Sequence, residues 1–342
     1  MKNNKMMRAA SGLMIAALLT TGMISGTFAK YTTQDELNDS ARVAKWGVNL
    51  GISGNLYGEA YDGANNTIVT SGSTATVQSS STGEKVVAPG TKNANSGLHI
   101  TLNGKPEVST KVYGTVKTQN IYLADGTYGV MVEANHVTAE DFAVGKDNAA
   151  GKDKKYYTEA NGTYAEANSY VSGTTYYTLE DEVTLAAPYY PVIYTGAGVT
   201  NGTTGADSLN EIGKNIAKML NGTDVTPTKE EGANVYTVAT GTTYAPNTDL
   251  ATALPDIKAA NITWEWGIGA DDNANGADTI LGNLLASTAG TASKVVYKDT
   301  SDYKAITVAA DTGLATAGTA ANITVASTKT SFDITLTVEQ AD

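Results

Sequence analysis

The chain has 342 residues, enough for one large β-rich domain with insertions or for two small domains. Its formal net charge is −12 and its Lys residues are scattered among acidic ones, which argues against nucleic acid as a partner. The sequence contains no cysteine, which excludes disulfides, thiolate metal sites and a cysteine nucleophile. Apolar content comes mainly from Ala, Val, Leu, Ile and 19 Tyr, a composition that favours β-strands.

Residues 1–29 have the three parts of a secretory signal peptide. A basic start, MKNNKMMR, precedes the apolar run GLMIAALL and a stretch that ends in small residues. We predict cleavage between Ala29 and Lys30. Cleavage changes the net charge from −12 to −15, because the 29 residues removed include three basic residues and no acidic residue. The apolar run is shorter than the roughly 20 residues of a membrane-spanning helix, so we expect no stable membrane anchor after processing.

The segment GTFAKYTTQDELNDSARVAKWGVNLGISG, residues 26–54, resembles the processing junction, polar spacer and first strand of the TasA and camelysin family. The family's junction motif is matched here by Thr27, Phe28, Ala29 and Tyr31. This sequence departs from it in having Lys30, Thr32 and Thr33 at the positions around the junction. The resemblance implies a protein secreted by a Gram-positive bacterium, cleaved by a SipW-type signal peptidase and deposited in the biofilm matrix.

The body of the chain reads mainly as strands. From Val43 to Ile52 apolar residues alternate with polar ones, as in a half-buried strand. A strand is predicted at 98–102, a turn at Asn103–Gly104 and another strand at 108–116, a block that also resembles the family's core. We therefore expect a jelly-roll-like β-sandwich over residues 43–342, with insertions around 145–180 and 205–260 and a few inserted helices.

Two amphipathic helices are predicted within this sheet-rich body. In DSLNEIGKNIAKMLNG the apolar residues recur with helical period, Asp207 or Ser208 can cap the start, and Gly222 follows the end. A second helix is expected from Asp278 to Ala286. Between them, Asn261–Gly267 reads as a strand with Ile262, Trp264 and Trp266 on one face, a block that resembles the carboxy-terminal part of large TasA-like proteins.

The insertion around 145–180 is rich in tyrosine and threonine. The tetrapeptide at 155–158, KYYT, returns as TYYT at 175–178, and we expect short hairpins joined by Gly turns that project from the main sheet. Two uses of the rings are open: cross-strand packing, or an aromatic platform that binds a glycan. The platform would consist of Tyr156, Tyr157, Tyr176 and Tyr177.

No catalytic constellation is visible, and we expect a protein that is not an enzyme. His99 and His136 are the only histidines, so the H-E-x-x-H metalloprotease pattern is absent, although camelysin-like relatives have been classed as metallopeptidases. No cofactor is expected apart from a possible calcium ion. The candidate ligands are Asp271, Asn273, Asn275 and Asp278, but the twelfth position of the loop is Gly282 instead of Glu. The alternative is an ordinary turn that leads into a capped helix.

The sequence as a whole favours a structural protein that assembles into extracellular fibres with copies of itself. After cleavage, residues 30–42 would form a free arm that enters the sheet edge of a neighbouring subunit. The residues assigned to this arm and its root are Lys30, Tyr31, Leu37, Val43 and Trp46. The alternative function is a monomeric adhesin or glycan-binding module at the cell surface.

Overall fold

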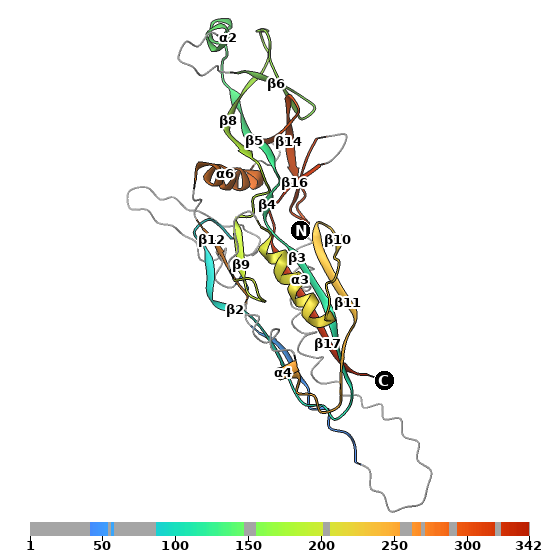
Figure 1. Ribbon diagram of the computed structural model, residues 1–342. Helices are drawn as coiled ribbons and strands as arrows, with labels where there is room; N and C mark the ends of the chain where they lie inside the picture. Colours follow the sequence, from blue (N-terminus) through green and yellow to red (C-terminus); the bar gives the residue numbers. More distant parts are fainter. Residues whose placement is uncertain are drawn as a thin grey trace, which may run out of the picture.

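The computed structural model describes residues 42–53, 56–57, 87–146, 155–200, 206–253, 262–267, 271–286, 293–318 and 323–341. These residues form a mainly β protein, which confirms the predicted fold class at this level. The molecule is elongated, with two four-stranded sheets in its lower part and a closed barrel in its upper part (Figure 1).

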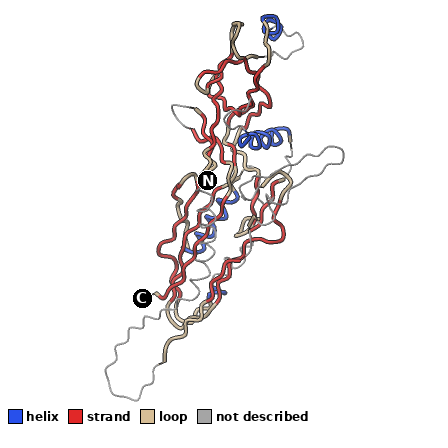
Figure 2. The backbone as a smooth tube through the Cα atoms, turned by 180° about the vertical axis from the view of Figure 1, so that it is seen from behind, coloured by secondary structure: helices blue, strands red, loops and turns tan. Residues whose placement is uncertain are grey.

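The first four-stranded sheet has the order β1-β2-β12-β9. Its strands are β1 (Asn49–Ser53), β2 (Lys92–Asn103), β12 (Ile262–Trp266) and β9 (Val192–Thr195). The second has the order β10-β11-β3-β17. Its strands are β10 (Thr228–Glu230), β11 (Ala233–Tyr244), β3 (Thr110–Gln119) and β17 (Ser331–Gln340). Figure 2 shows that the strands of this lower part run along the long axis. Every pairing in both sheets is antiparallel.

Helix α3 (Ser208–Asn221) packs between the two sheets and follows the predicted pattern closely. Asp207 accepts a hydrogen bond from the Asn210 N–H at the start, and Gly222 ends the helix in the left-handed conformation. The buried residues of the helix form one face against β3, β11 and β9. Ile262, Trp264 and Trp266 are also buried, as predicted for one face of β12. One hydrophobic core therefore joins both sheets and α3.

The upper part is a barrel of six strands closed by the pairing of β13 with both β5 and β14. In order around the barrel, the strands are β13 (Ser293–Asp299), β5 (Gly126–Ala134), β8 (Tyr176–Leu185), β6 (Tyr157–Ala160), β7 (Thr163–Glu166) and β14 (Asp302–Val308). Three further strands continue from β14: β15 (Leu314–Ala317), β16 (Ile323–Ser327) and β4 (Tyr122–Leu123). A hairpin is present in the tyrosine-rich region, formed by β6 and β7 and joined by Asn161–Gly162. It does not project from the main sheet as predicted, because β6 also pairs with β8 and β7 with β14, and it completes the barrel.

Helix α6 (Asp272–Ala286) lies between the barrel and the lower part (Figure 1). It begins six residues before the predicted start at Asp278, because Asp271 accepts a hydrogen bond from the Ala274 N–H and caps it. Gly276, which reads as a turn residue, lies within the helix where its backbone approaches Val183 of β8. The other helices among the described residues are α2 (Ala139–Lys146) and α4 (Leu250–Ala253). Across the described segments, none of the helices has the length and apolarity needed to cross a membrane.

The core around α3 gives a stability prediction. Ile216 is fully buried, so the Ile216→Ala variant is expected to lower the free energy of unfolding by about 2–5 kcal/mol through lost burial and the cavity left behind. Denaturant titration followed by circular dichroism measures this change. The control is Glu211→Ala at an exposed position of the same helix, with an expected loss below about 1 kcal/mol. Equal losses in both variants would contradict the assigned packing of α3.

Candidate assembly site

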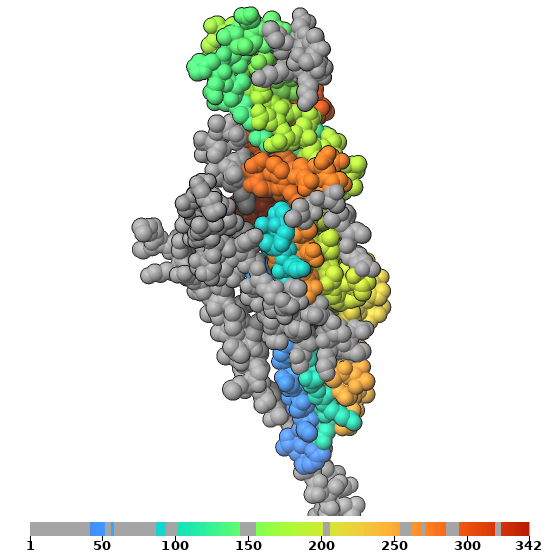
Figure 3. Space-filling model, turned by 90° about the vertical axis from the view of Figure 1, so that its left-hand side faces the viewer, coloured from blue at the N-terminus to red at the C-terminus, as the bar shows by residue number. Residues whose placement is uncertain are grey.

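The root of the predicted arm lies along the lower end of the molecule as an extended segment. In the space-filling view the blue segment, which includes Arg42 to Ser53, forms part of the surface there (Figure 3). Val43 is 66% exposed and Trp46 is half-buried, in keeping with the predicted alternation. The chain then enters β1, which pairs with β2 from Asn49↔Asn103 to Ser53↔His99 at the edge of the first sheet. The other assigned residues, Ala29, Lys30, Tyr31 and Leu37, lie outside the described residues.

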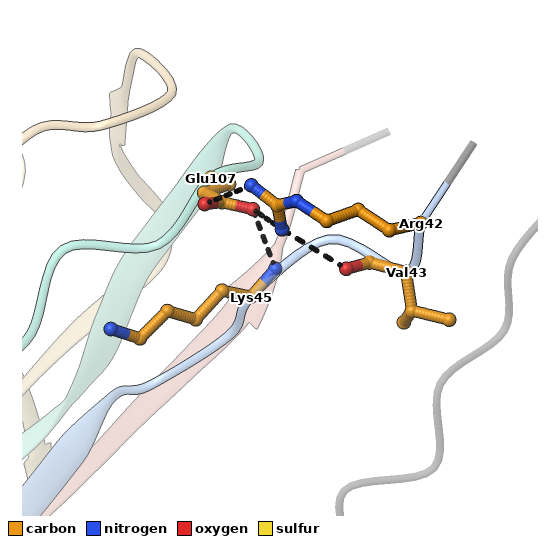
Figure 4. A network of polar contacts seen from close by, with 4 residues as sticks. All are labelled: Arg42, Val43, Lys45 and Glu107. Atoms are coloured by element: carbon orange, nitrogen blue, oxygen red, sulfur yellow. Dashed lines mark hydrogen bonds and ion pairs between the residues drawn. The ribbon is translucent and has the colours of Figure 1, made fainter. Parts of the chain in front are cut away.

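A single carboxylate, that of Glu107, holds the beginning of this segment (Figure 4). Its two oxygens accept hydrogen bonds from Arg42 Nη1 and Nη2 at 2.7 and 2.8 Å, and Oε2 also accepts the Lys45 N–H at 2.9 Å. The Glu107 N–H in turn donates to the Lys45 carbonyl oxygen at 2.9 Å. These hydrogen bonds and the Arg42 charge lower the pKa of Glu107 to about 2. We call this group of Arg42, Lys45 and Glu107 the root clamp.

Residues 47–48 of this segment cross the loop after β2 so closely that their backbone contacts the backbone of Gly104. A Cβ added to Gly104, which has φ +133°, would lie 2.5 Å from the Gly47 carbonyl oxygen and 2.9 Å from Val48 Cα. Gly47 itself adopts φ +52°. Asn103 and Gly104 were predicted to form a turn between neighbouring strands; instead the chain passes here from the first sheet to the second, because β2 and β3 belong to different sheets. Glycine is required at Gly104 by the close approach of the root.

Two further contacts fasten the chain just after β1. The Leu56 carbonyl oxygen accepts hydrogen bonds from Trp264 Nε1 at 2.5 Å and Asn93 Nδ2 at 2.6 Å. The Tyr57 hydroxyl lies 3.1 Å from both the Tyr194 hydroxyl and Thr330 Oγ1. Burial raises the pKa of Tyr57 to about 12, so the hydroxyl stays protonated and can donate at neutral pH. The N-terminal segment is thus part of the folded body as far back as Arg42.

A long open sheet edge ends beside the root. Strand β17 pairs with β3 without a register shift from Ser331↔Gln119 to Gln340↔Thr110, and no described strand pairs with its other edge. The Ala341 N–H donates to the carbonyl oxygen of Ser109, which follows Glu107 by two residues. The end of β17 therefore lies close to the root clamp. Strand edges are commonly protected by bulges, prolines or charged side chains; β17 has no bulge and no proline, and its charged residues are Asp333 and Glu339.

The tyrosine-rich region supplies packing for the upper part. Tyr156, Tyr157 and Tyr176 are 6%, 5% and 2% exposed, and only Tyr177 of the predicted glycan platform is half-exposed. Tyr157 meets Tyr303 edge-to-face inside the barrel, and Tyr156 stacks on Phe142 of α2. The rings are therefore used for cross-strand and helix packing, and they do not form an exposed platform.

The candidate calcium residues lie at the start of α6, as in the capped-helix alternative. Asp271 caps the helix, and Asn273 and Asn275 are exposed within its first turns. Asp278 Oδ1 accepts hydrogen bonds from the Tyr189 hydroxyl at 2.9 Å and Trp266 Nε1 at 3.2 Å, and burial raises its pKa. In the described residues, no group of three or more His, Cys, Asp or Glu side chains is placed to hold a metal ion. Asp278 therefore connects α6 to the lower part of the molecule.

One histidine lies in a strand and the other in a turn. His99 lies in β2, opposite Ser53, and His136 has φ 56° in the turn after β5. Sequence reasoning missed the parts that Glu107 and Gly104 play at the root. The partners of Glu107 lie 62 and 65 residues earlier, and no local pattern connects them.

Comparison with protein-family models, with curated proteins and with solved structures finds no match for this chain.

The crossing at Gly104 gives a second prediction. Gly104→Ala is expected to displace residues 45–48 and to lower the free energy of unfolding by about 1–3 kcal/mol, since the new methyl group would overlap the Gly47 carbonyl. Hydrogen exchange followed by mass spectrometry should show faster exchange in residues 42–50. Gly282→Ala is the matched control, because an added Cβ meets no atom within 4 Å in α6, and it should leave this exchange unchanged. Unchanged exchange in Gly104→Ala would contradict the crossing.

Proposed function

We propose that this protein is a secreted, non-enzymatic structural protein that assembles into extracellular fibres by head-to-tail strand donation. The observation that carries the proposal is the path of the N-terminal segment. Residues 42–53, drawn in blue, lie at the surface at one end of the elongated molecule (Figures 1 and 3), and Arg42 is exposed and hydrogen-bonded to Glu107. A segment that precedes Arg42 can therefore extend from this end and reach a second copy.

The edge of β17 offers a fitting acceptor. Residues 30–41 number twelve, and β17 pairs with β3 over ten residues in an antiparallel ladder without a register shift, while no strand among the described residues pairs with its outer edge. A donated strand would gain backbone hydrogen bonds along this edge, as in other cases of strand addition. Arm and edge are different surfaces of the same chain. Their contact is therefore heterologous and propagates without closing.

The rest of the proposal follows from the resemblance of the N-terminal region to the TasA and camelysin family. It includes export from a Gram-positive cell, processing by a SipW-type signal peptidase between Ala29 and Lys30, and a place in the biofilm matrix. Within this proposal the two four-stranded sheets of the lower part correspond to the jelly-roll-like sandwich, an architecture that also has eight strands in two sheets.

Removal of the arm tests the proposal. The chain of residues 30–342 is expected to form fibres, whereas a chain that begins at Arg42 is expected to stay monomeric in light scattering and electron micrographs. A chain in which residues 30–41 are replaced by a Gly/Ser segment of equal length controls for length, and it should also stay monomeric, because a flexible Gly/Ser segment pairs poorly as a strand. Fibres of normal yield from either variant would refute strand donation.

The processing step has its own test. Mass spectrometry of the protein recovered from culture medium is expected to find Lys30 as the first residue, since small residues precede it. A first residue C-terminal to Arg42 would remove the whole arm and contradict the proposed assembly. A retained residue 1–29 segment would contradict the predicted signal peptide.

A further inference from the structure

We propose that Glu107 is the positioning residue of the assembly arm: its carboxylate sets the direction in which the chain leaves the body at Arg42, and its loss or protonation frees the chain from Arg42 up to residues 46–48. The consequence for fibres rests on the function proposed above. The clamp itself is a property of the single molecule and can be measured without fibres.

The geometry is that of an anchor for one particular path of the chain. A planar guanidinium that donates two parallel hydrogen bonds fixes the orientation of both partners, which a single contact does not. The third donor, the Lys45 N–H, comes from the backbone, so it fixes the chain and not only a side chain. Arg42 and Lys45 are three residues apart, and one carboxylate therefore defines both the position and the direction of the segment between them.

Glu107 belongs to the loop of residues 104–107, and hydrogen bonds hold this loop to the rest of the protein. The Gly104 carbonyl oxygen accepts the Leu250 N–H at 3.0 Å, and the Pro106 carbonyl oxygen accepts the Asn247 N–H at 2.6 Å. Pro106 is buried. The loop of residues 104–107 is thus tied to the first residue of α4 and to the turn before it on one side, and to the root on the other. Release of the root leaves this loop in place, because its own hydrogen bonds do not pass through Arg42.

Apolar packing contributes little at the start of the root. Val43 and Lys45 are exposed, and Ala44 is a small residue that is half-buried. Burial of such a short, exposed stretch offers little hydrophobic stabilisation, so polar contacts decide whether it stays on the body. From Val48 onward the side chains pack against the main core. The expected boundary between released and retained chain therefore lies at residues 46–48.

Low pH is expected to release the root from the body, because it protonates Glu107. The charged groups that face Glu107 are Arg42 and Lys45, and both favour its ionised form. The folded-state pKa, about 2, lies below the ordinary value of 4.5, so the clamp stabilises the docked root above about pH 4.5 and loses this effect as the pH falls toward 2. Arg42 keeps its charge throughout this range, because a guanidinium loses its proton only far above neutral pH.

A spin label at the root tests the proposal directly. The chain has no cysteine, so Val43→Cys gives a single labelling site in the chain of residues 30–342, and its exposed side chain makes none of the clamp's contacts. At pH 7 the label is expected to show an ordered spectrum, and adding Glu107→Gln should increase the mobile fraction severalfold. The matched control is Glu166→Gln, which removes a carboxylate from the exposed Lys155 pair in the barrel and should leave the label ordered.

Acid titration and fibre growth complete the experiment. With Glu107 present, the mobile fraction should rise between pH 4.5 and 2 while circular dichroism shows the fold intact; with Glu107→Gln it should be high at every pH. Fibre growth at pH 7 should be severalfold slower for Glu107→Gln than for Glu166→Gln. Equal label order in both variants would overturn the clamp, and equal fibre growth would overturn its positioning role. Fibres from the chain that begins at Arg42 would instead overturn the proposed function, whatever the label shows.

Discussion

The backbone contact between residues 45–48 and the loop 104–107 is the constraint on which the N-terminal architecture depends. Because Gly104 carries no side chain, the root can cross this loop at contact distance and continue directly into β1 at the edge of the first sheet. The same crossing brings Arg42 and the Lys45 N–H within reach of Glu107. One glycine and one carboxylate, both on a loop that connects the two sheets, thus determine where the chain enters the fold.

A second polar contact holds the two parts of the molecule together. Asp278 of α6, the helix that packs against barrel strands including β8, accepts hydrogen bonds from Tyr189 and from Trp266 of the first sheet. The carboxyl group is half-buried, and burial raises its pKa. A buried carboxyl group needs such donors, because an unpaired one would cost free energy. This contact adds to the main hydrophobic core, which includes residues of the barrel, of α6 and of the lower sheets.

Patterns over a few neighbouring residues were enough to predict α3 and the buried face of β12. Asp207 and Gly222 predicted the ends of α3, and alternation predicted the buried face of β12, because capping and periodicity act over a few residues. The early start of α6 was missed because Gly276 and the Asn and Asp residues around it are also ordinary turn residues. The closed barrel and the clamp could not be predicted. The barrel is closed because Val296 of β13 lies opposite both Ala305 of β14 and Gly129 of β5. The clamp depends on the contact between Arg42 and Glu107. Contacts between residues so far apart in the sequence leave no local pattern.

The charged residues of β17 affect which strand could pair with its outer edge. Asp333 lies opposite Lys117 and Glu339 opposite Lys111, whose Nζ is 3.7 Å from the Glu339 carboxylate. The acidic residues of the edge strand are thus balanced by the neighbouring strand within the same sheet. An arm such as residues 30–41, which has three acidic residues and one basic residue, then meets little net repulsion. Under strand donation, recognition would rest on backbone hydrogen bonds, which any extended segment provides, and the direction set by Glu107 would select the segment that arrives.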